Sequence, residues 1–261
     1  MLTKRLIACF DIVSGRVTKA VQFQDNIDVA SAEELAAAMY DAQIDELIFY
    51  DITASAEKRS IDIETVRKVA RRVFIPFTVG GGIKNLDDMY EALKAGAEKI
   101  SIDSMAVRNP QIITDGAQAF GSQCIVLSTQ VKRTGQTPSG FEVFIDGARL
   151  ATGMDAIEWI RRGQELGAGE ICVNSIDRDG TLSGYDLELM KQAEAVVNVP
   201  LIASGGAGAP EHLRALFADT EAQAAIISSM LYSPRLERNY SVRELKEYLA
   251  RNGIHVRPVK E

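Results

Sequence analysis

Residues 74–83 read FIPFTVGGGI, and residues 199–208 read VPLIASGGAG. In each stretch a short apolar run, typical of a buried strand, ends directly in glycines. Matching Val79 with Ala203 gives an offset of 203 − 79 = 124 residues, close to half of the 261-residue chain. A strand-and-turn unit that recurs at half the chain length indicates a fold built from two similar halves.

Further pairs of segments repeat at a similar spacing. The offset is 170 − 46 = 124 for one pair, 227 − 102 = 125 for another and 130 − 11 = 119 at the start of the chain. Every pair lies at a strand-like segment, so the repeat covers the framework of the fold. The pairs are Glu46–Tyr50 with Glu170–Asn174, Ile102–Ser104 with Ile227–Ser229, and Leu6–Asp11 with Ile125–Gln130.

Strand-like and helix-like patterns alternate along the whole chain. Short strands that are apolar throughout predict a parallel sheet covered on both faces. At this length a closed barrel is the economical solution, so we predict an α/β fold, a (β/α)8 TIM barrel of two half-barrels, in one domain over 1–261. The predicted strands are Leu6–Phe10, Leu47–Tyr50, Phe77–Val79, Ile100–Ile102, Cys124–Thr129, Ile171–Asn174, Leu201–Ala203 and Ala224–Ile227, and the predicted helices are Ser31–Ala42, Ile63–Val73, Asn85–Ala95, Pro110–Phe120, Ala156–Leu166, Leu187–Val196, Glu211–Phe217 and Val242–Arg251.

An open, doubly wound sheet is the alternative fold. A nucleotide-binding fold of this kind typically has a glycine-rich turn after the first strand. Residues 11–16 follow that strand here and read DIVSGR, which is not such a turn. A second feature is an insertion near 133–153, where turn residues flank the run Phe141–Ile145. We interpret it as a hairpin on the face where such barrels keep their active sites.

Composition narrows the class of function. A net charge of −7 and a pI near 5.1 argue against a nucleic-acid partner but leave room for a phosphorylated small molecule held by backbone amides. No apolar run reaches membrane-spanning length and no signal peptide is visible, so we expect a cytoplasmic protein without a membrane partner. The cysteines Cys9, Cys124 and Cys172 form no CxxC pair and are expected to be free thiols. No metal or cofactor is expected.

The glycines after the repeated strands are candidates for two phosphate cradles. Backbone N–H groups approach an anion closely at glycine, and a doubled barrel would place two such cradles symmetrically. This suits a substrate that carries a phosphate at each end. The residues concerned are Gly81 and Gly82 in the first half, and Gly205, Gly206, Ser228 and Ser229 in the second.

The chain resembles the cyclase subunit of imidazole glycerol phosphate synthase from near its first residue to near its last. Stretches that carry the resemblance are LTKRLIACFD (2–11), DELIFYDITAS (45–55), FIPFTVGGGI, FGSQC (120–124), LGAGEI (166–171), DRDGTLSGYDLE (177–188), VPLIASGGAG and ELKEYL (244–249). The resemblance implies an enzyme of histidine biosynthesis, of the lyase or cyclase type. Such an enzyme takes ammonia from a partner glutaminase through the barrel. It converts a bis-phosphorylated ribulosyl formimino substrate to imidazole glycerol phosphate and an aminoimidazole carboxamide ribotide.

The resemblance also implies roles for individual residues. Asp11 matches one catalytic aspartate, and Lys19 matches the lysine of the first loop. The family has a ring of charges at the ammonia entrance, and four residues match it: Arg5, Glu46, Lys99 and Glu170. This match implies a docked glutaminase in a heterodimer. Charges so near a core are expected to pair with one another. The remaining residues implied to bind substrate or phosphate are Asp51, Asp103, Ser104, Asn174, Asp179, Gly180 and Ser204.

Two residues depart from the family pattern. Gln130 stands where the family has its second catalytic aspartate, and the internal repeat places it opposite Asp11. An amide cannot exchange a proton, and losing a positioned acid–base group typically costs about 10²–10⁴-fold in rate. Asp103 stands where the family usually has asparagine, and a carboxylate there would repel a phosphate.

These departures leave several functions open. The first hypothesis is a working cyclase that tolerates Gln130 or takes its proton from a neighbour such as Asp179. The second is a diverged paralogue that passes ammonia to another acceptor, such as a nucleotide-linked sugar. The chain is otherwise a non-catalytic scaffold for a glutaminase, or an aminoimidazole carboxamide ribotide isomerase, which shares the doubled barrel. Turnover of the bis-phosphate with ammonium separates these alternatives.

Overall fold

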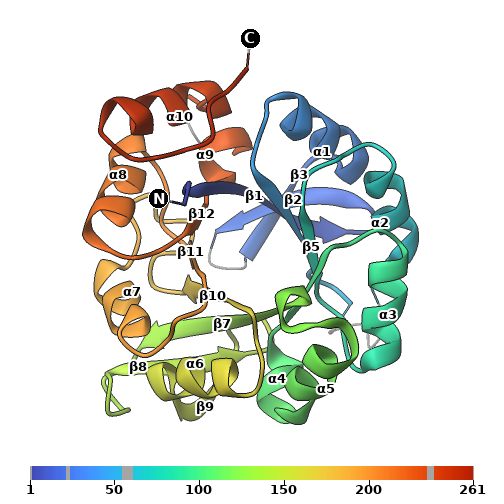
Figure 1. Ribbon diagram of the computed structural model, residues 1–261, viewed down its shortest axis with the longest axis vertical. Helices are drawn as coiled ribbons and strands as arrows, with labels where there is room; N and C mark the ends of the chain where they lie inside the picture. The colour runs from blue at the N-terminus through green and yellow to red at the C-terminus, as the bar shows by residue number, and fades with distance from the viewer. Residues whose placement is uncertain (1, 22–23, 55–60, 234–237, 261) are drawn as a thin grey trace.

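A computed structural model describes residues 2–21, 24–54, 61–233 and 238–260, and gives the backbone alone for residues 19–21 and 24–29. Its centre is a closed ring of parallel strands with helices around the outside (Figure 1). The ring closes because β7 pairs with β10 as well as with β6, which confirms the predicted TIM barrel. In ring order the strands are β1 (Arg5–Val13), β4 (Glu46–Asp51), β5 (Phe77–Gly80), β6 (Lys99–Ile102), β7 (Ile125–Arg133), β10 (Glu170–Ser175), β11 (Leu201–Ser204) and β12 (Ala224–Ile226).

Helices follow the strands and cover the outer face of the ring (Figure 1). Polar residues begin several of them: the Ser31 hydroxyl accepts from the Glu34 N–H at 3.2 Å, and the Asp155 carboxylate accepts from the Glu158 N–H at 3.1 Å. Such caps satisfy N–H groups that the first turn leaves without partners. The helices are α1 (Ala32–Asp41), α2 (Ile63–Ala70), α3 (Leu86–Lys94), α4 (Ser104–Arg108), α5 (Gln111–Phe120), α6 (Ala156–Glu165), α7 (Leu187–Glu194), α8 (Pro210–Asp219), α9 (Ser228–Tyr232) and α10 (Val242–Arg251).

Alternate residues of each strand face opposite sides of the ring, and this alternation organises the core. Along β1, Leu6, Ala8 and Phe10 belong to the large apolar cluster beneath the helices. Ile7 belongs to a separate, smaller cluster inside the ring, and Cys9 packs against that cluster. Odd-numbered residues of β1 therefore face inward, and the same reasoning assigns the inner face of every other strand.

Two strands run on beyond the ring and carry hairpins. β1 continues to Val13 and pairs antiparallel with β2 (Arg16–Val21), which pairs with β3 (Gln24–Ser31). β7 continues to Arg133 and pairs antiparallel with β8 (Phe141–Ile145), which pairs with β9 (Leu150–Asp155). Neither β2 nor β3 was predicted, and Cys124 lies in a short 3-10 turn (Ser122–Cys124) rather than in the strand predicted there. Ile227 caps α9 instead of ending a strand.

Candidate functional site

The carboxyl ends of the ring strands gather five predicted site residues on the inner face. By the alternation of each strand these are Asp11, Asp103, Gln130, Asn174 and Ser204. The register supports the grouping, since Asn174 lies level with Gln130 of β7 on one side and with Ser204 of β11 on the other. Side chains from separate strands thus line one mouth of the barrel.

Asp103 and Gln130 are in direct contact at this mouth. The Nε2 group of Gln130 donates a hydrogen bond to Oδ2 of Asp103. Gln130 is only 9% exposed, and its Oε1 is buried with no hydrogen-bond partner among the described residues. The sequence singled out both residues but gave no sign that they touch.

The carboxyl group of Asp103 has an unusual acidity. The residue as a whole is half-buried, but the loss of water around its carboxyl raises the pKa to about 7. The hydrogen bond from Gln130 opposes the shift, the negative charge of Asp146 adds to it, and the positive charge of Arg108 opposes it. At neutral pH this carboxyl therefore populates both its protonated and its ionised form, as a proton carrier requires.

Asp11 lies at the same mouth, on β1, which is three strands from β6 in the ring. Its backbone carbonyl accepts from the Thr18 hydroxyl at 3.3 Å, which holds β2 against the end of the strand. The negative charge of Asp11 also interacts with the Tyr232 hydroxyl. The pKa of Tyr232 is raised mainly by burial and in smaller part by Asp11. Lys19 lies in β2, level with Ile27 of β3, and its side chain lies outside what the structure describes.

The two predicted phosphate cradles have the backbone geometry that requires glycine. Gly81 has φ +83°, and a Cβ there would lie 2.3 Å from the carbonyl oxygen of Asp51. Gly206 has φ +103°, and a Cβ there would lie 2.1 Å from the carbonyl oxygen of Gly184. Gly82 and Gly205, beside them, also have positive φ. Both turns thus bring bare backbone to the mouth, where N–H groups can meet an anion.

Two predicted binding residues use their side chains within the protein. The buried hydroxyl of Ser228 donates to the Cys9 carbonyl at 2.7 Å and accepts from the Cys9 N–H at 2.8 Å, which joins α9 to β1. Asp51 is buried at the end of β4, and its carboxylate accepts from the Ala54 N–H at 3.1 Å. Their side chains thus help to shape the mouth.

The other predicted binding residues lie in turns around it. The Ser104 hydroxyl, at the start of α4, accepts from the Asp146 N–H at 3.0 Å, which ties α4 to the turn between β8 and β9. Asp179 and Gly180 lie in the turn after β10, and the Asp179 N–H lies close to Gly205. Ser229 is half-buried in the first turn of α9.

The opposite end of the barrel carries the predicted ring of charges. Arg5 pairs with Glu46 at 2.5 Å and also with Glu170, while Lys99 pairs with Glu46 at 2.8 Å and with Glu170 at 2.7 Å. The glutamate side chains are 1% and 5% exposed, and those of Arg5 and Lys99 are 26% and 18% exposed. Each carboxylate thus accepts from both cations, so the four side chains form one closed network.

Polar groups also lie midway along the inner face, where sequence reasoning missed them. The Tyr50 hydroxyl lies 3.1 Å from the Ser101 hydroxyl and donates to that of Ser128 at 3.4 Å. Burial raises the pKa of Tyr50 well above its ordinary value and that of the neighbouring Cys172 to about 12, so both groups stay neutral. The prediction that these strands are apolar throughout is therefore wrong on their inner face, and the polar residues at every second position of the strands are the signal that identifies this group.

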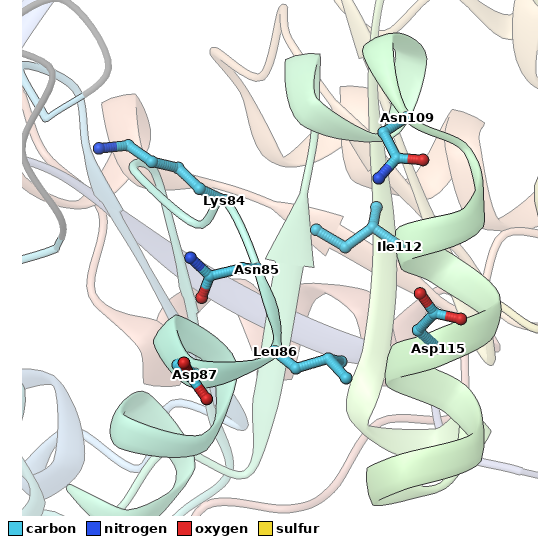
Figure 2. A pocket seen from close by; sticks show the side chains of 7 residues that line it. All are labelled: Lys84, Asn85, Leu86, Asp87, Asn109, Ile112 and Asp115. Carbon is cyan, nitrogen blue, oxygen red and sulfur yellow. The ribbon is translucent and has the colours of Figure 1, made fainter.

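The pocket drawn in Figure 2 contains none of the predicted site residues. This pocket of about 320 Å³ lies outside the barrel between the start of α3 and helix α5 (Figure 2); it is lined by Lys84, Asn85, Leu86, Asp87, Asn109, Ile112 and Asp115. Within the described part of the chain, no group of three His, Cys, Asp or Glu residues is placed to hold a metal ion. None of the described helices is long and apolar enough to cross a membrane.

Comparison with known proteins identifies relatives along the whole length. The model of the histidine biosynthesis protein family matches residues 5–237. The chain is 50% identical to the imidazole glycerol phosphate synthase subunit HisF of Desulfatibacillum aliphaticivorans over 98% of both chains, and 50% identical to that of Desulfosudis oleivorans over 98% of this chain and 99% of the relative. Identity to the HisF subunit of Solidesulfovibrio magneticus is 49%, over 99% of this chain and 100% of the relative.

Proposed function

This chain belongs to the histidine biosynthesis protein family, among the HisF cyclase subunits of imidazole glycerol phosphate synthase, and we propose that it works as such a cyclase on ammonia delivered by a glutaminase. It converts a bis-phosphorylated ribulosyl formimino substrate to imidazole glycerol phosphate and an aminoimidazole carboxamide ribotide. We expect the two subunits to form a heterodimer in the cytoplasm.

The proposal is supported by the placement of a charge network and a polar mouth at opposite ends of one barrel, as an ammonia route through it would require. The charge network of Arg5, Glu46, Lys99 and Glu170 stands at the amino ends of the strands, and the polar mouth stands at the carboxyl ends. Between them the inner face holds small or apolar side chains and the neutral group of Tyr50, Ser101 and Ser128. A neutral molecule the size of ammonia suits such an interior, whereas an ion does not.

The positions of the glycine turns support a substrate with two phosphates. The turn of Gly81 follows β5 and that of Gly206 follows β11, and these strands are four apart in the ring of eight. The turns therefore face each other across the mouth. A substrate held at both ends spans the barrel axis, with its reacting carbons between Asp11 and Asp103.

The glutaminase docks on the other end, over the charge network. The network is neutral overall, because two cations face two carboxylates. Passage of ammonia requires one cation to leave its partners, and Lys99 is the simpler one because it is a single flexible chain. We propose that docking of the glutaminase favours this movement.

A turnover assay tests the proposal. The purified chain is mixed with the ribulosyl formimino bis-phosphate and excess ammonium, which removes the need for the glutaminase. We expect steady release of the aminoimidazole carboxamide ribotide, and the Asp11→Asn variant should lose most of it. Glutamine should replace ammonium only after the glutaminase subunit of a relative is added.

Each other outcome identifies a different function. Tight binding of the bis-phosphate without turnover would contradict a working cyclase and would indicate a non-catalytic scaffold. No binding at all would overturn the substrate assignment and would favour an ammonia acceptor of another kind.

A further inference from the structure

The two residues that depart from the family pattern are partners of one another. β6 and β7 are neighbours, with Ile102 level with Leu127, so Asp103 and Gln130 both reach the mouth from adjacent strands. The amide of Gln130 donates to the carboxylate of Asp103. The resemblance implied an amide at position 103 and a carboxylate at position 130. This chain also has one amide and one carboxylate in contact there, but their places are exchanged.

The exchange leaves the site with the same inventory of groups. The pair carries one ionisable proton and at most one negative charge in either arrangement. What changes is the strand that holds the carboxyl, which moves from β7 to β6. Two substitutions that each look damaging when read separately are therefore compensatory when they are read as a pair.

The surroundings of Asp103 favour proton exchange. Four groups interact with its carboxyl electrically or by a hydrogen bond: Gln130 of β7, Arg108 of α4, Asp146 of the turn between β8 and β9, and Cys172 of β10. Arg108 and Asp146 pair with each other at 2.5 Å, so their effects on Asp103 partly cancel. Burial remains the main influence and places the pKa at about 7.

The amide of Gln130 suits both forms of its partner. Its N–H group donates to the ionised carboxylate, as the structure shows. After rotation by half a turn, its carbonyl would accept from the protonated carboxyl. The buried and otherwise unpartnered Oε1 is the atom that this second arrangement would use.

We propose that Asp103 is the second proton carrier of this site, working with Asp11 at the same mouth, and that Gln130 is the residue that positions its carboxyl. The proposal rests on the cyclase function proposed above and deepens it. The nitrogen of ammonia gives up three protons as it forms its bonds to carbon: two go to the ribulosyl carbonyl oxygen, whose C–O bonds break as it leaves as water, and one goes to the departing amine as its C–N bond breaks. Asp103 donates its proton to a departing group, and its carboxylate then recovers one from the attacking nitrogen, so the cycle is balanced.

The test uses variants of the full chain in the ammonium assay. Asp103→Asn, which is nearly isosteric, should lower kcat by about 10²–10⁴-fold with little change in KM. The double variant Asp103→Asn with Gln130→Asp returns the carboxyl to β7 and should recover activity to within about tenfold of the unmodified chain. Asp115→Asn, on α5 beside the surface pocket, is the matched control and should leave kcat unchanged.

The pH dependence separates positioning from mere packing. The unmodified chain should show an inflection of kcat near pH 7 that Asp103→Asn lacks. Gln130→Met removes the hydrogen bond that lowers the pKa of Asp103, so the inflection should move to higher pH. A structural role alone would lower activity without moving the inflection.

The outcomes distinguish this inference from the function on which it rests. An active unmodified chain whose Asp103→Asn variant keeps full kcat would overturn the role of Asp103 and leave the cyclase function standing. A double variant no better than Asp103→Asn would overturn the exchange of places. No turnover by the unmodified chain would overturn the cyclase function, and this inference with it.

Discussion

Replacing Glu46 by glutamine should destabilise the barrel strongly, although the two side chains are almost the same size. Glu46 is 1% exposed and pairs with Arg5 at 2.5 Å and with Lys99 at 2.8 Å. Glu46→Gln leaves both cations on Glu170 alone, where they repel each other with less compensation. Removing one partner of a fully buried ion pair typically costs about 3–5 kcal/mol.

The exposure of the cations reduces this cost. Side chains of Arg5 and Lys99 that are 26% and 18% exposed recover part of their hydration when Glu46 is neutral. The amide carbonyl also keeps one weaker hydrogen bond from a cation. We therefore expect the free energy of unfolding to fall by about 2–4 kcal/mol, about 1 kcal/mol less than for a fully buried pair. Urea denaturation of the full chain, followed by circular dichroism, measures it as a lower midpoint with an unchanged slope.

A surface pair provides the control for this prediction. Glu158 and Arg161 form an ion pair on α6 with side chains that are 62% and 42% exposed. Exposed pairs contribute about 0–1 kcal/mol, so Glu158→Gln should barely move the midpoint. If Glu46→Gln cost no more than Glu158→Gln, the network would not stabilise the fold and the reasoning from burial would be refuted.

Three further predictions concern the mouth of the barrel. Asp11→Asn should lower kcat by about 10²–10⁴-fold in the ammonium assay and leave KM nearly unchanged, and a rise in KM alone would instead assign Asp11 to binding. Gly206→Ala should weaken the binding of inorganic phosphate, measured by calorimetry, and lower the unfolding midpoint, because its Cβ would lie 2.1 Å from the Gly184 carbonyl oxygen. Gly253→Ala, where a Cβ has open space, is the control, and equal effects of the two variants would contradict the steric argument. Because the pKa of Asp103 is raised, its carboxyl keeps a proton in the folded state that it loses above about pH 4 in the unfolded state. This residue should therefore make the free energy of unfolding fall as pH rises from about 4 to about 7, by at most about 1.4 kcal/mol for each pH unit. Urea midpoints of the unmodified chain should therefore converge with those of Asp103→Asn at low pH and diverge towards pH 7, and parallel curves would show that the carboxyl is not buried in this way.

The sequence predicts the framework well because the framework depends on local periodicity. The repeated runs that end at Gly81 and Gly206 indicate both the strands and the half-barrel symmetry. Apolar residues at regular helix or strand spacing leave few alternative assignments of secondary structure. Polar capping residues such as Asp155 mark where helices begin. The β2 and β3 hairpin escaped prediction because residues 16–31 are rich in polar side chains, whereas the ring strands were identified as runs that are apolar throughout. Val21, Ile27 and Val29 do alternate with polar residues, as in a half-exposed strand, and this alternation was the available signal.

The site was harder to predict because it depends on contacts between strands. Asp103 and Gln130 are 27 residues apart, and their meeting follows only from the adjacency of β6 and β7 together with the inward alternation of both. Sequence reasoning treated Gln130 as a loss and Asp103 as a repulsive charge. Neither reading allowed one substitution to compensate for the other, because no local pattern connects them.

The order of the layers inside the barrel explains why proton transfer belongs at the mouth. The apolar side chains of Ile7, Ile48 and Val126 lie on the inner face beyond the charge network, and Tyr50 and Cys172 remain neutral because burial raises the pKa of each. An ammonium ion would lose its hydration there without gaining a counter-charge, so the proposed route suits neutral ammonia. Protons exchanged during ring formation must then be carried by groups at the carboxyl ends of the strands. Asp11 and Asp103 lie among the inward side chains there, and burial raises the pKa of Asp103 towards neutrality.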